Sequence, residues 1–191
     1  KCSACGAAMT AIATVTDGTN TYYAADAATL NQAVTAILET GSRTFTVELP
    51  ADAEAGMITA IRRAICDTEG VADGSINLTL KGVTSIPGTT NWDGVAFGPR
   101  NAQWDENNVE IVSHEEVPQL ASINLPDVTE IGAQAFLNCS KLTSITAPKV
   151  QSIGDWGLQS TAITSIDMPL LKEAGYAAFC GTALTEVSLP S

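Results

Sequence analysis

Basic side chains are scarce in this sequence of 191 residues: nine Lys and Arg stand against 21 Asp and Glu, giving a formal net charge of −12. Nucleic-acid-binding proteins neutralise phosphates with clustered Lys and Arg, so this balance argues against a nucleic-acid partner. It also disfavours attraction to an anionic membrane surface. No apolar run approaches the roughly 20 residues that span a bilayer, so we expect no transmembrane segment.

Cysteine is also too sparse, with five scattered residues, for the framework of a disulfide-rich miniprotein. Cys2 and Cys5 form a CxxC motif, but a structural zinc site needs four ligands and no second pair follows. A redox CxxC opens a helix after a strand, whereas this one stands at the start of the sequence. We therefore expect no metal and no cofactor, and interpret the pair as part of a loose tail or as a local disulfide.

The one histidine, His114, stands between polar residues, and the sequence has no GxSxG, P-loop, GxGxxG or HExxH motif. A nucleophilic pair of His114 with Cys66 or Cys139 has no local signature to support it. Both cysteines stand in apolar surroundings that are typical of buried, inert thiols. We therefore expect no catalytic residues, and an enzyme is the weakest of the functional hypotheses.

Self-similarity in the last third of the chain is the strongest signal in the sequence. Leu120, Leu142, Ile163 and Leu184 begin successive copies of one pattern, at intervals of 22, 21 and 21 residues. Alternating apolar residues at the start of each copy predict a half-buried strand, which a proline ends. The following Val-x-x-Ile-Gly segment is expected to turn the chain, with glycine in a conformation that other residues resist. One copy cannot bury its own apolar face, so the copies must stack with their strands parallel.

This pattern resembles the BspA-like branch of leucine-rich repeats, which is known from surface proteins of anaerobic bacteria and of some protists. Residues 120–142 match the motif Leu-x-x-Ile-x-Leu-Pro-x-Val-x-x-Ile-Gly-x-x-Ala-Phe-x-x-Cys-x-x-Leu in full. The second copy has Gly157-Leu158 in the Ala-Phe position, and the third has Cys180 directly after Phe179. The resemblance covers residues 120–191. It implies an α/β fold, a right-handed leucine-rich repeat solenoid with a parallel strand ladder.

The preceding residues, 22–119, predict irregular, helix-containing repeats that cap the array, after a tail over residues 1–21. One helix is expected between Asp26 and Gly41, and another between Asp52 and Gly70. Their apolar stripes are Leu30, Ala33, Val34, Ile37 and Leu38 in the first and Ile58, Ile61 and Ile65 in the second.

Strands alternate with these helices. Val47-Glu-Leu49-Pro50 repeats the strand ending, and residues 78–86 match residues 123–131 apart from Lys81 in place of proline. Ala96-Phe97 is expected to fill the Ala-Phe position of this copy, but later in the sequence than in the other copies, which we call a delayed position. Val109-Glu-Ile111-Val112 is a candidate short strand.

Aligning the strands predicts two columns of outward side chains on one face. They are Thr46, Asn77, Ser122, Ser144, Ser165 and Glu186 in the first, and Glu48, Thr79, Asn124, Thr146, Asp167 and Ser188 in the second. Repeat proteins commonly bind ligands on such a face, so the candidate ligand-binding residues are Asn77, Thr79, Ser122, Asn124, Ser144, Thr146, Ser165 and Asp167. The alternative is that these short polar residues only solvate the sheet, because no aromatic or arginine anchor stands among them.

Four aromatic residues and one loop have other interpretations. Trp156 and Tyr176 stand beside the Ala-Phe positions and favour edge packing over a sugar platform. Trp92 and Trp104, in polar segments, are better candidates for exposed contacts, although packing is the favoured interpretation there too. Asp17-Gly-Thr-Asn20 lacks the spacing of a calcium loop and predicts a turn.

The resemblance to BspA-like adhesins implies a non-catalytic, extracytoplasmic module that binds a protein or a glycan. It implies a place at the cell surface, with or without a lipid anchor, or a secreted protein. The alternative function is a structural spacer or assembly domain of a larger surface protein. The last copy lacks a polar capping repeat, so we also expect end-to-end self-association through the C-terminal repeat.

Overall fold

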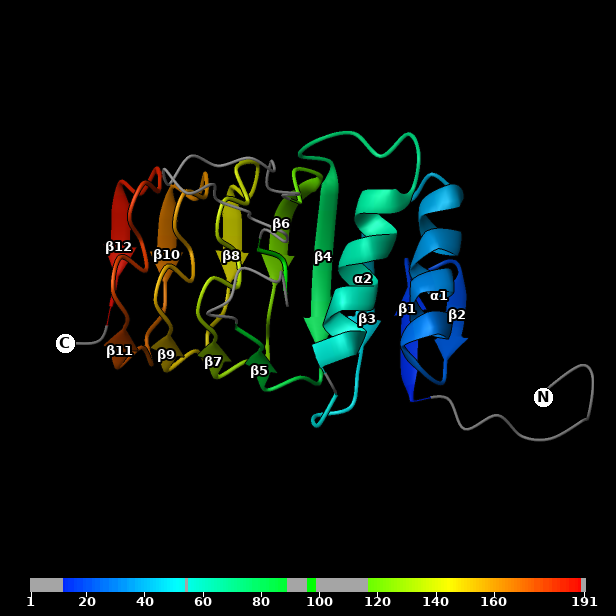
Figure 1. The fold of residues 1–191 in the computed structure, drawn as a ribbon, viewed down its shortest axis with the longest axis horizontal. Coiled ribbons are helices and arrows are strands. Elements are labelled where there is room, and N and C mark those ends of the chain that lie inside the picture. The colour runs from blue at the N-terminus through cyan, green and yellow to red at the C-terminus, as the bar shows by residue number, and fades with distance from the viewer. Residues whose placement is uncertain (1–11, 54, 89–95, 99–116, 190–191) are drawn as a thin grey trace, which may run out of the picture.

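The computed structural model describes residues 12–53, 55–88, 96–98 and 117–189, and shows a row of short strands with two helices at one end (Figure 1). In chain order the described elements are β1 (Ala13–Thr16), β2 (Thr21–Ala24), α1 (Ala27–Glu39), β3 (Thr44–Glu48), α2 (Ala55–Asp67), β4 (Ile76–Lys81), β5 (Ser85–Ile86), β6 (Leu120–Asn124), β7 (Glu130–Ile131), β8 (Ser144–Thr146), β9 (Ser152–Ile153), β10 (Ser165–Asp167), β11 (Glu173–Ala174) and β12 (Glu186–Ser188).

The strands form two parallel ladders, the first of which continues into an antiparallel hairpin. One hydrogen-bonded sheet has the order β2-β1-β3-β4-β6-β8, and β10 and β12 form a parallel pair beside β8. The second ladder has the order β11-β9-β7-β5. From β4 onward the chain alternates between the two ladders, so that successive strands of one ladder are separated by a strand of the other (Figure 1). The predicted α/β fold with a parallel strand ladder is confirmed.

The first helix, α1, forms where the apolar spacing predicts it. Its buried side chains are the five predicted ones, Leu30, Ala33, Val34, Ile37 and Leu38. Asp26 caps its start, because the Asp26 carboxylate accepts hydrogen bonds from the Thr29 backbone N–H at 2.8 Å and the Thr29 hydroxyl at 2.7 Å. These bonds, the backbone one foremost, lower the pKa of Asp26 below its ordinary value. Gly41 follows the last turn with a φ of +88°, a conformation that ends helices.

The second helix, α2, buries Ile58, Ile61 and Ile65 as predicted and packs beside α1. Both helices lie over the N-terminal end of the row of strands (Figure 1). The Asn31 side chain of α1 donates a hydrogen bond from Nδ2 to the Ala60 carbonyl of α2 at 3.1 Å. The predicted order of helix, strand, helix and strand over residues 22–86 is therefore confirmed.

An antiparallel hairpin corrects the tail that was predicted for residues 1–21. β1 pairs with β2 on one side and with β3 on the other, so the described part of this segment belongs to the sheet from Ala13 onward. The predicted turn is confirmed between the two strands: Asp17 Oδ1 accepts hydrogen bonds from the backbone N–H of Thr19 at 2.9 Å and of Asn20 at 2.7 Å. Two buried residues, Ala13 and Val15, are too few to predict a strand from their alternation.

The second ladder was not predicted, because its strands are only two residues long. Ile86, Ile131 and Ile153 are buried at the second position of β5, β7 and β9. The glycines that follow do not occupy a left-handed conformation, contrary to the prediction; they let neighbouring repeats approach closely. A Cβ on Gly132 would overlap the Gly88 nitrogen, and one on Gly154 would lie 2.5 Å from the Ala133 nitrogen.

The Ala-Phe positions align with one another across the repeats despite their differences in sequence. The backbone N–H of Phe97, Phe136 and Leu158 each donates at 2.9 Å to the repeat that follows, to the carbonyls of Ala135, Gly157 and Ala178 respectively. The Phe97 and Phe136 rings stack with centroids 5.4 Å apart. Ala96-Phe97 is thus the delayed Ala-Phe position that the sequence predicted, and Leu158 takes the place of a phenylalanine in the buried column.

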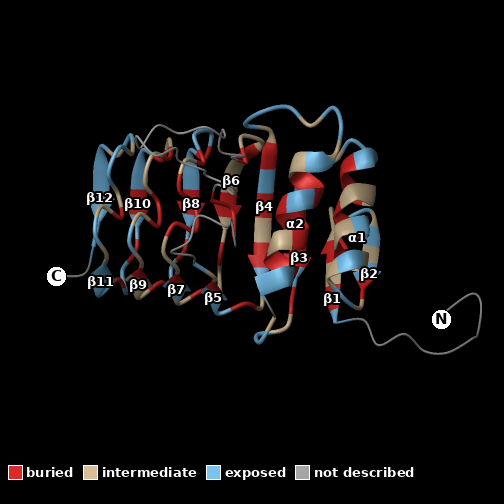
Figure 2. Cartoon of the chain, viewed as in Figure 1, coloured by how far each residue is buried: buried red, intermediate tan, exposed pale blue. Residues whose placement is uncertain are grey.

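One hydrophobic core runs from Ala13 to Ala178, through both the helical part and the repeats (Figure 2). Ile123, Ile145 and Ile166 occupy adjoining layers of this core and are 1%, 7% and 4% exposed. The domain boundary placed between residues 119 and 120 stays a prediction. The candidate strand at Val109–Val112 lies outside the described residues.

The close glycine contacts generate the first prediction. Gly154→Ala should lower the free energy of unfolding by about 1–3 kcal/mol, because its Cβ would overlap the backbone of the preceding repeat. Gly56→Ala is the matched control: it lies in α2 with open space around it, and alanine there should raise the free energy of unfolding by about 0.5–1 kcal/mol. Urea denaturation followed by circular dichroism measures both, and equal effects would contradict the proposed role of the glycine contact.

Candidate functional site

The strand face is the candidate site, and we define it as the outward side chains of β3, β4, β6, β8, β10 and β12. Inward residues of β3, β4, β6, β8 and β10 pack in the core, whereas the outward ones are exposed or half-buried; all three residues of β12 are exposed. The paired registers arrange them in two columns: Thr44, Asn77, Ser122 and Ser144 followed by Ser165 and Glu186, and Thr46, Thr79, Asn124 and Thr146 followed by Asp167 and Ser188. All eight candidate residues therefore lie on one face, in the predicted columns.

The position of β3 in these columns differs from the prediction by two residues. Thr46 pairs with Thr79 rather than with Asn77, and Glu48 pairs with Lys81. A shift of two residues keeps every side chain on its predicted face, so the alternation of apolar residues cannot distinguish the two registers. Gly82 does distinguish them: it lies against the Leu49 carbonyl, which a Cβ at Gly82 would overlap. The observed register thus places Gly82, which has no side chain, at the close contact with the Leu49 carbonyl.

Hydrogen bonds connect neighbouring side chains of the first column. The Ser122 hydroxyl donates to Asn77 Oδ1 at 2.6 Å, and Asn77 Nδ2 donates to the Thr44 hydroxyl at 3.5 Å. Hydroxyl and amide groups both donate and accept, so this row can meet a peptide backbone or sugar hydroxyls. The strand face is nearly uncharged at its centre and becomes acidic toward the last repeats, at Asp167 and Glu186.

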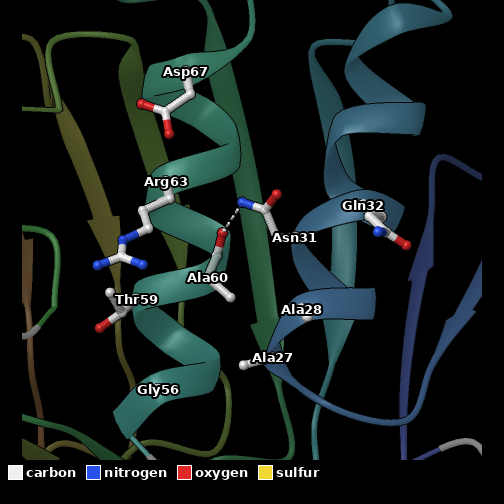
Figure 3. A pocket seen from close by; sticks show the side chains of 9 residues that line it. All are labelled: Ala27, Ala28, Asn31, Gln32, Gly56, Thr59, Ala60, Arg63 and Asp67. Carbon is white, nitrogen blue, oxygen red and sulfur yellow. Dashed lines mark hydrogen bonds between the residues drawn. The ribbon is translucent and has the colours of Figure 1, made fainter.

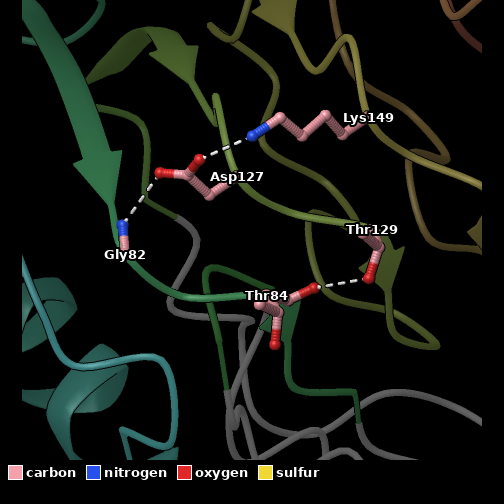
Figure 4. A network of polar contacts seen from close by, with 5 residues as sticks. All are labelled: Gly82, Thr84, Asp127, Thr129 and Lys149. Atoms are coloured by element: carbon pink, nitrogen blue, oxygen red, sulfur yellow. Dashed lines mark hydrogen bonds and ion pairs between the residues drawn. The ribbon is translucent and has the colours of Figure 1, made fainter.

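A polar network just beyond the strands ties three repeats together (Figure 4). The Asp127 carboxylate accepts a hydrogen bond from Lys149 Nζ at 2.9 Å and another from the Gly82 backbone N–H at 3.2 Å. The bond from Lys149, followed by that from Gly82, lowers the pKa of Asp127 below its ordinary value of 3.8. Thr129 adds a further link, from its hydroxyl to the Thr84 carbonyl at 3.0 Å. The network therefore links three successive repeats at one edge of the strand face.

Similar links between repeats were not predicted from the sequence. The hydroxyls of Thr143 and Thr185 donate to the carbonyls of Ala121 and Thr164 in the repeat before, at 3.1 and 3.2 Å. The signal for them was present, because threonine recurs at residues 143, 164 and 185 with the period of the repeat.

A groove of about 690 Å³ between α1 and α2 is an alternative to the strand face (Figure 3). Small residues line much of it, among them Ala27, Ala28 and Gly56. The Arg63 side chain points away from α1 in Figure 3, and the Asn31 amide already bonds to α2. The groove thus lacks a set of polar groups directed at a common point, which ligand sites usually have.

The residues with potential for redox or acid–base chemistry do not come together in the described structure. Cys139 is buried, and its thiol donates to the Phe97 carbonyl at 3.2 Å. Cys66 is half-buried in the α2 region and Cys180 is exposed near the last repeat. His114, Cys2, Cys5, Trp92 and Trp104 lie outside the described residues. Within the described ranges, no group of three or more His, Cys, Asp or Glu could hold a metal ion.

Trp156 and Tyr176 pack against each other on neighbouring repeats, with ring centroids 5.9 Å apart and planes at 84°. The Tyr176 backbone N–H also bonds to the Asp155 carboxylate at 2.6 Å. This edge-to-face contact agrees with the packing role that the sequence favours.

Comparison with known proteins supports the repeat assignment. Residues 110–191 match the family model of the BspA type leucine-rich repeat region, in six copies, which confirms the resemblance predicted from residues 120–142. No curated protein matches the sequence. Neither helix of the described structure is long and apolar enough to cross a membrane.

Among solved structures, the crystal structure of the pneumococcal vaccine antigen PcpA is similar, with a TM-score of 0.42 and 18% sequence identity. The alignment covers 78% of this chain and 34% of that one, so the chain spans about a third of the length of that antigen.

The Asp127 network predicts an acid sensitivity. Because the folded protein holds the pKa of Asp127 below its unfolded value, this carboxylate stabilises the fold above the unfolded pKa, and the stabilisation is lost as the pH falls through the folded pKa. The free energy of unfolding should therefore fall less between about pH 5 and about pH 2 in Asp127→Asn than in the wild type. Lys149→Gln should weaken the pH dependence in the same way, because it removes the main cause of the shift. Urea denaturation at both pH values measures the difference, and an unchanged pH dependence in both variants would contradict the assignment.

Proposed function

We propose that this protein, whose residues 110–191 form a BspA-type leucine-rich repeat region, is a non-catalytic binding module that recognises another protein through its strand face. In this proposal the alternating strands are successive coils of a right-handed solenoid. A glycan is the second class of ligand that the same surface chemistry would suit. The module acts outside the cytoplasm, at the cell surface or after secretion, in adhesion; a lipid anchor is one way of holding it there.

The arrangement of the two columns of the strand face carries this proposal. Parallel pairing places equivalent side chains of neighbouring strands in register, as in Asn77, Ser122 and Ser144. Neighbouring strands lie about 4.8 Å apart, so the face offers donors and acceptors at a regular interval. An extended peptide or a sugar chain presents its own polar groups repeatedly and can make many such bonds at once.

The side chains of the strand face also favour recognition over catalysis. Ser, Thr and Asn dominate its centre, and the hydroxyl of Ser122 is occupied by Asn77 rather than by a base. Activation of a serine nucleophile needs an adjacent general base that a third group orients. The short side chains form an open surface rather than a cavity, and such a surface suits a macromolecule better than a small substrate.

The second candidate function is a structural spacer or assembly domain. The exposed apolar side chains of the last repeat, Val187 and Leu189, favour it, because they offer a surface for packing against another domain or chain. Such a protein would need the end of the row of repeats and would tolerate changes on the strand face.

A substitution on the strand face separates the two functions. Ser144→Arg places a long charged side chain in the middle of the first column and should weaken binding to the ligand about tenfold or more, by excluding it from the face. Ser85→Arg is the matched control, since Ser85 is an exposed serine at the start of β5 in the other ladder. The ligand is sought by surface plasmon resonance against a panel of extracellular matrix proteins and glycans, with each variant tested on every positive.

Equal binding by Ser144→Arg and the wild type would refute the strand face as the site. If no protein or glycan of the panel binds and the chain still associates with another domain or chain, the spacer function is favoured. Thermal denaturation of both variants ensures that a loss of binding does not come from unfolding.

A further inference from the structure

A row of four outward side chains lies beside the two columns of the strand face and continues onto the hairpin of β1 and β2. The registers place Tyr23 of β2 opposite Thr14 of β1, and Thr14 opposite Glu48 of β3. Glu48 in turn lies opposite Lys81 of β4. Tyr23 is 66% exposed, and Glu48 and Lys81 are exposed, whereas Thr14 is half-buried. Tyr23 thus provides, next to the strand face, the aromatic side chain that the two columns lack.

The short side chain of Thr14 lies between two longer ones and leaves a notch. Opposite Cα atoms of antiparallel strands lie about 4.5–5.5 Å apart, so the Cα atoms of Tyr23 and Glu48 are about 10 Å apart across Thr14. An open cavity of about 340 Å³ lies on the Glu48 side, and its lining residues are Ile12, Ala13, Thr14, Glu48, Leu49 and Pro50. We call this surface the hairpin notch and define it by Ile12, Thr14, Tyr23, Glu48 and Pro50.

The hairpin notch carries a carboxylate without a partner. Within the residues that the structure describes, the Glu48 carboxylate forms no ion pair and no hydrogen bond. Lys81, which lies opposite it, acts on a second carboxylate: the bond from Lys149 is the main cause that lowers the pKa of Asp127, and the positive charge of Lys81 adds to that shift. The chain as a whole has a net charge of −12. A cationic group therefore complements the notch.

Arginine fits the hairpin notch better than other cations do. Its planar guanidinium stacks on an aromatic ring such as that of Tyr23 and binds a carboxylate such as that of Glu48 through two N–H groups. Its aliphatic stem can pack on Pro50 and on Ile12, which is 45% exposed. The Thr14 hydroxyl between the two walls can accept one of the remaining N–H groups.

We propose that the hairpin notch receives an arginine side chain of the protein that the strand face binds. This proposal rests on the proposed function and adds the chemistry of one contact in the partner. Glu48 is an outward residue of β3 and so belongs to both surfaces, which allows one partner to cover the strand face and the notch together. The notch would then fix the position of the partner along the otherwise repetitive columns.

A peptide titration tests the notch without the unidentified partner. The probe is acetyl-Gly-Gly-Arg-Gly-Gly-amide, added to the isotope-labelled chain and followed by NMR. It should cause saturable shifts of the backbone amides of Thr14, Tyr23 and Glu48, and the same peptide with citrulline, the neutral isostere of arginine, should not. Glu48→Gln and Tyr23→Leu should each weaken binding about two- to fivefold, the worth of one exposed ion pair or cation–π contact.

Glu130→Gln is the matched control, because Glu130 is an exposed glutamate in β7 of the second ladder and its exchange removes the same charge. It should leave the peptide affinity unchanged. No saturable binding, equal binding of the citrulline peptide, or equal weakening by Glu130→Gln and Glu48→Gln would overturn the proposal. Circular dichroism of each variant shows that it is folded.

The strand face and the notch can fail independently. The proposed function is read from the loss of a panel ligand in Ser144→Arg, which the peptide titration does not involve. A protein ligand whose binding falls in Ser144→Arg and is unchanged in both Glu48→Gln and Tyr23→Leu would leave the proposed function standing and overturn the arginine contact. A protein ligand that all three variants weaken supports both.

Discussion

Each repeat of this protein depends on its neighbour to cover an apolar surface that it cannot cover alone. Ile123, Ile145 and Ile166 are nearly inaccessible because each is flanked by the next strand of the ladder. The glycine contacts reinforce this dependence, since Gly132 and Gly154 allow backbone to approach backbone where a Cβ would intervene. The stability of each repeat therefore depends on its contacts with the adjacent repeats, as in other repeat proteins. The spacing of the repeats, the register of their strands and the residues left on the surface all follow from these contacts.

The N-terminal end meets the same requirement by different means. There α1 and α2 cover the inward residues of the sheet, and the hairpin of β1 and β2 places an antiparallel strand at its edge. An antiparallel strand can be joined by a tight turn, which Asp17 stabilises, whereas each further parallel strand would need a long connection. Helices and a hairpin thus cover the row of strands at its N-terminal end.

Patterns that depend on a repeating interior could be predicted from the sequence, and features that depend on single contacts could not. The helix stripes, the cap at Asp26, the strands of the first ladder and the delayed position of Phe97 all follow from apolar spacing or from the 21- and 22-residue period. The second ladder could not be predicted, because a strand of two residues has no alternation to detect. The register of β3 against β4 also escaped prediction, because it depends on the contact of Gly82 with Leu49. The eight candidate residues lie in their predicted columns because they belong to β4, β6, β8 and β10, which the register error of β3 does not involve.

The strand face owes its order to the core beneath it rather than to its own side chains. Inward residues set the register, and the outward positions between them inherit it, with lateral bonds such as Ser122 to Asn77 added afterwards. Outward side chains can therefore change without disturbing the fold, which lets one scaffold present many different surfaces. The last repeat is different, because its exposed residues are interior residues. Val187 of β12 occupies the position that is interior in β8 and β10, so its apolar character comes from the pattern of the repeat rather than from a role at the surface.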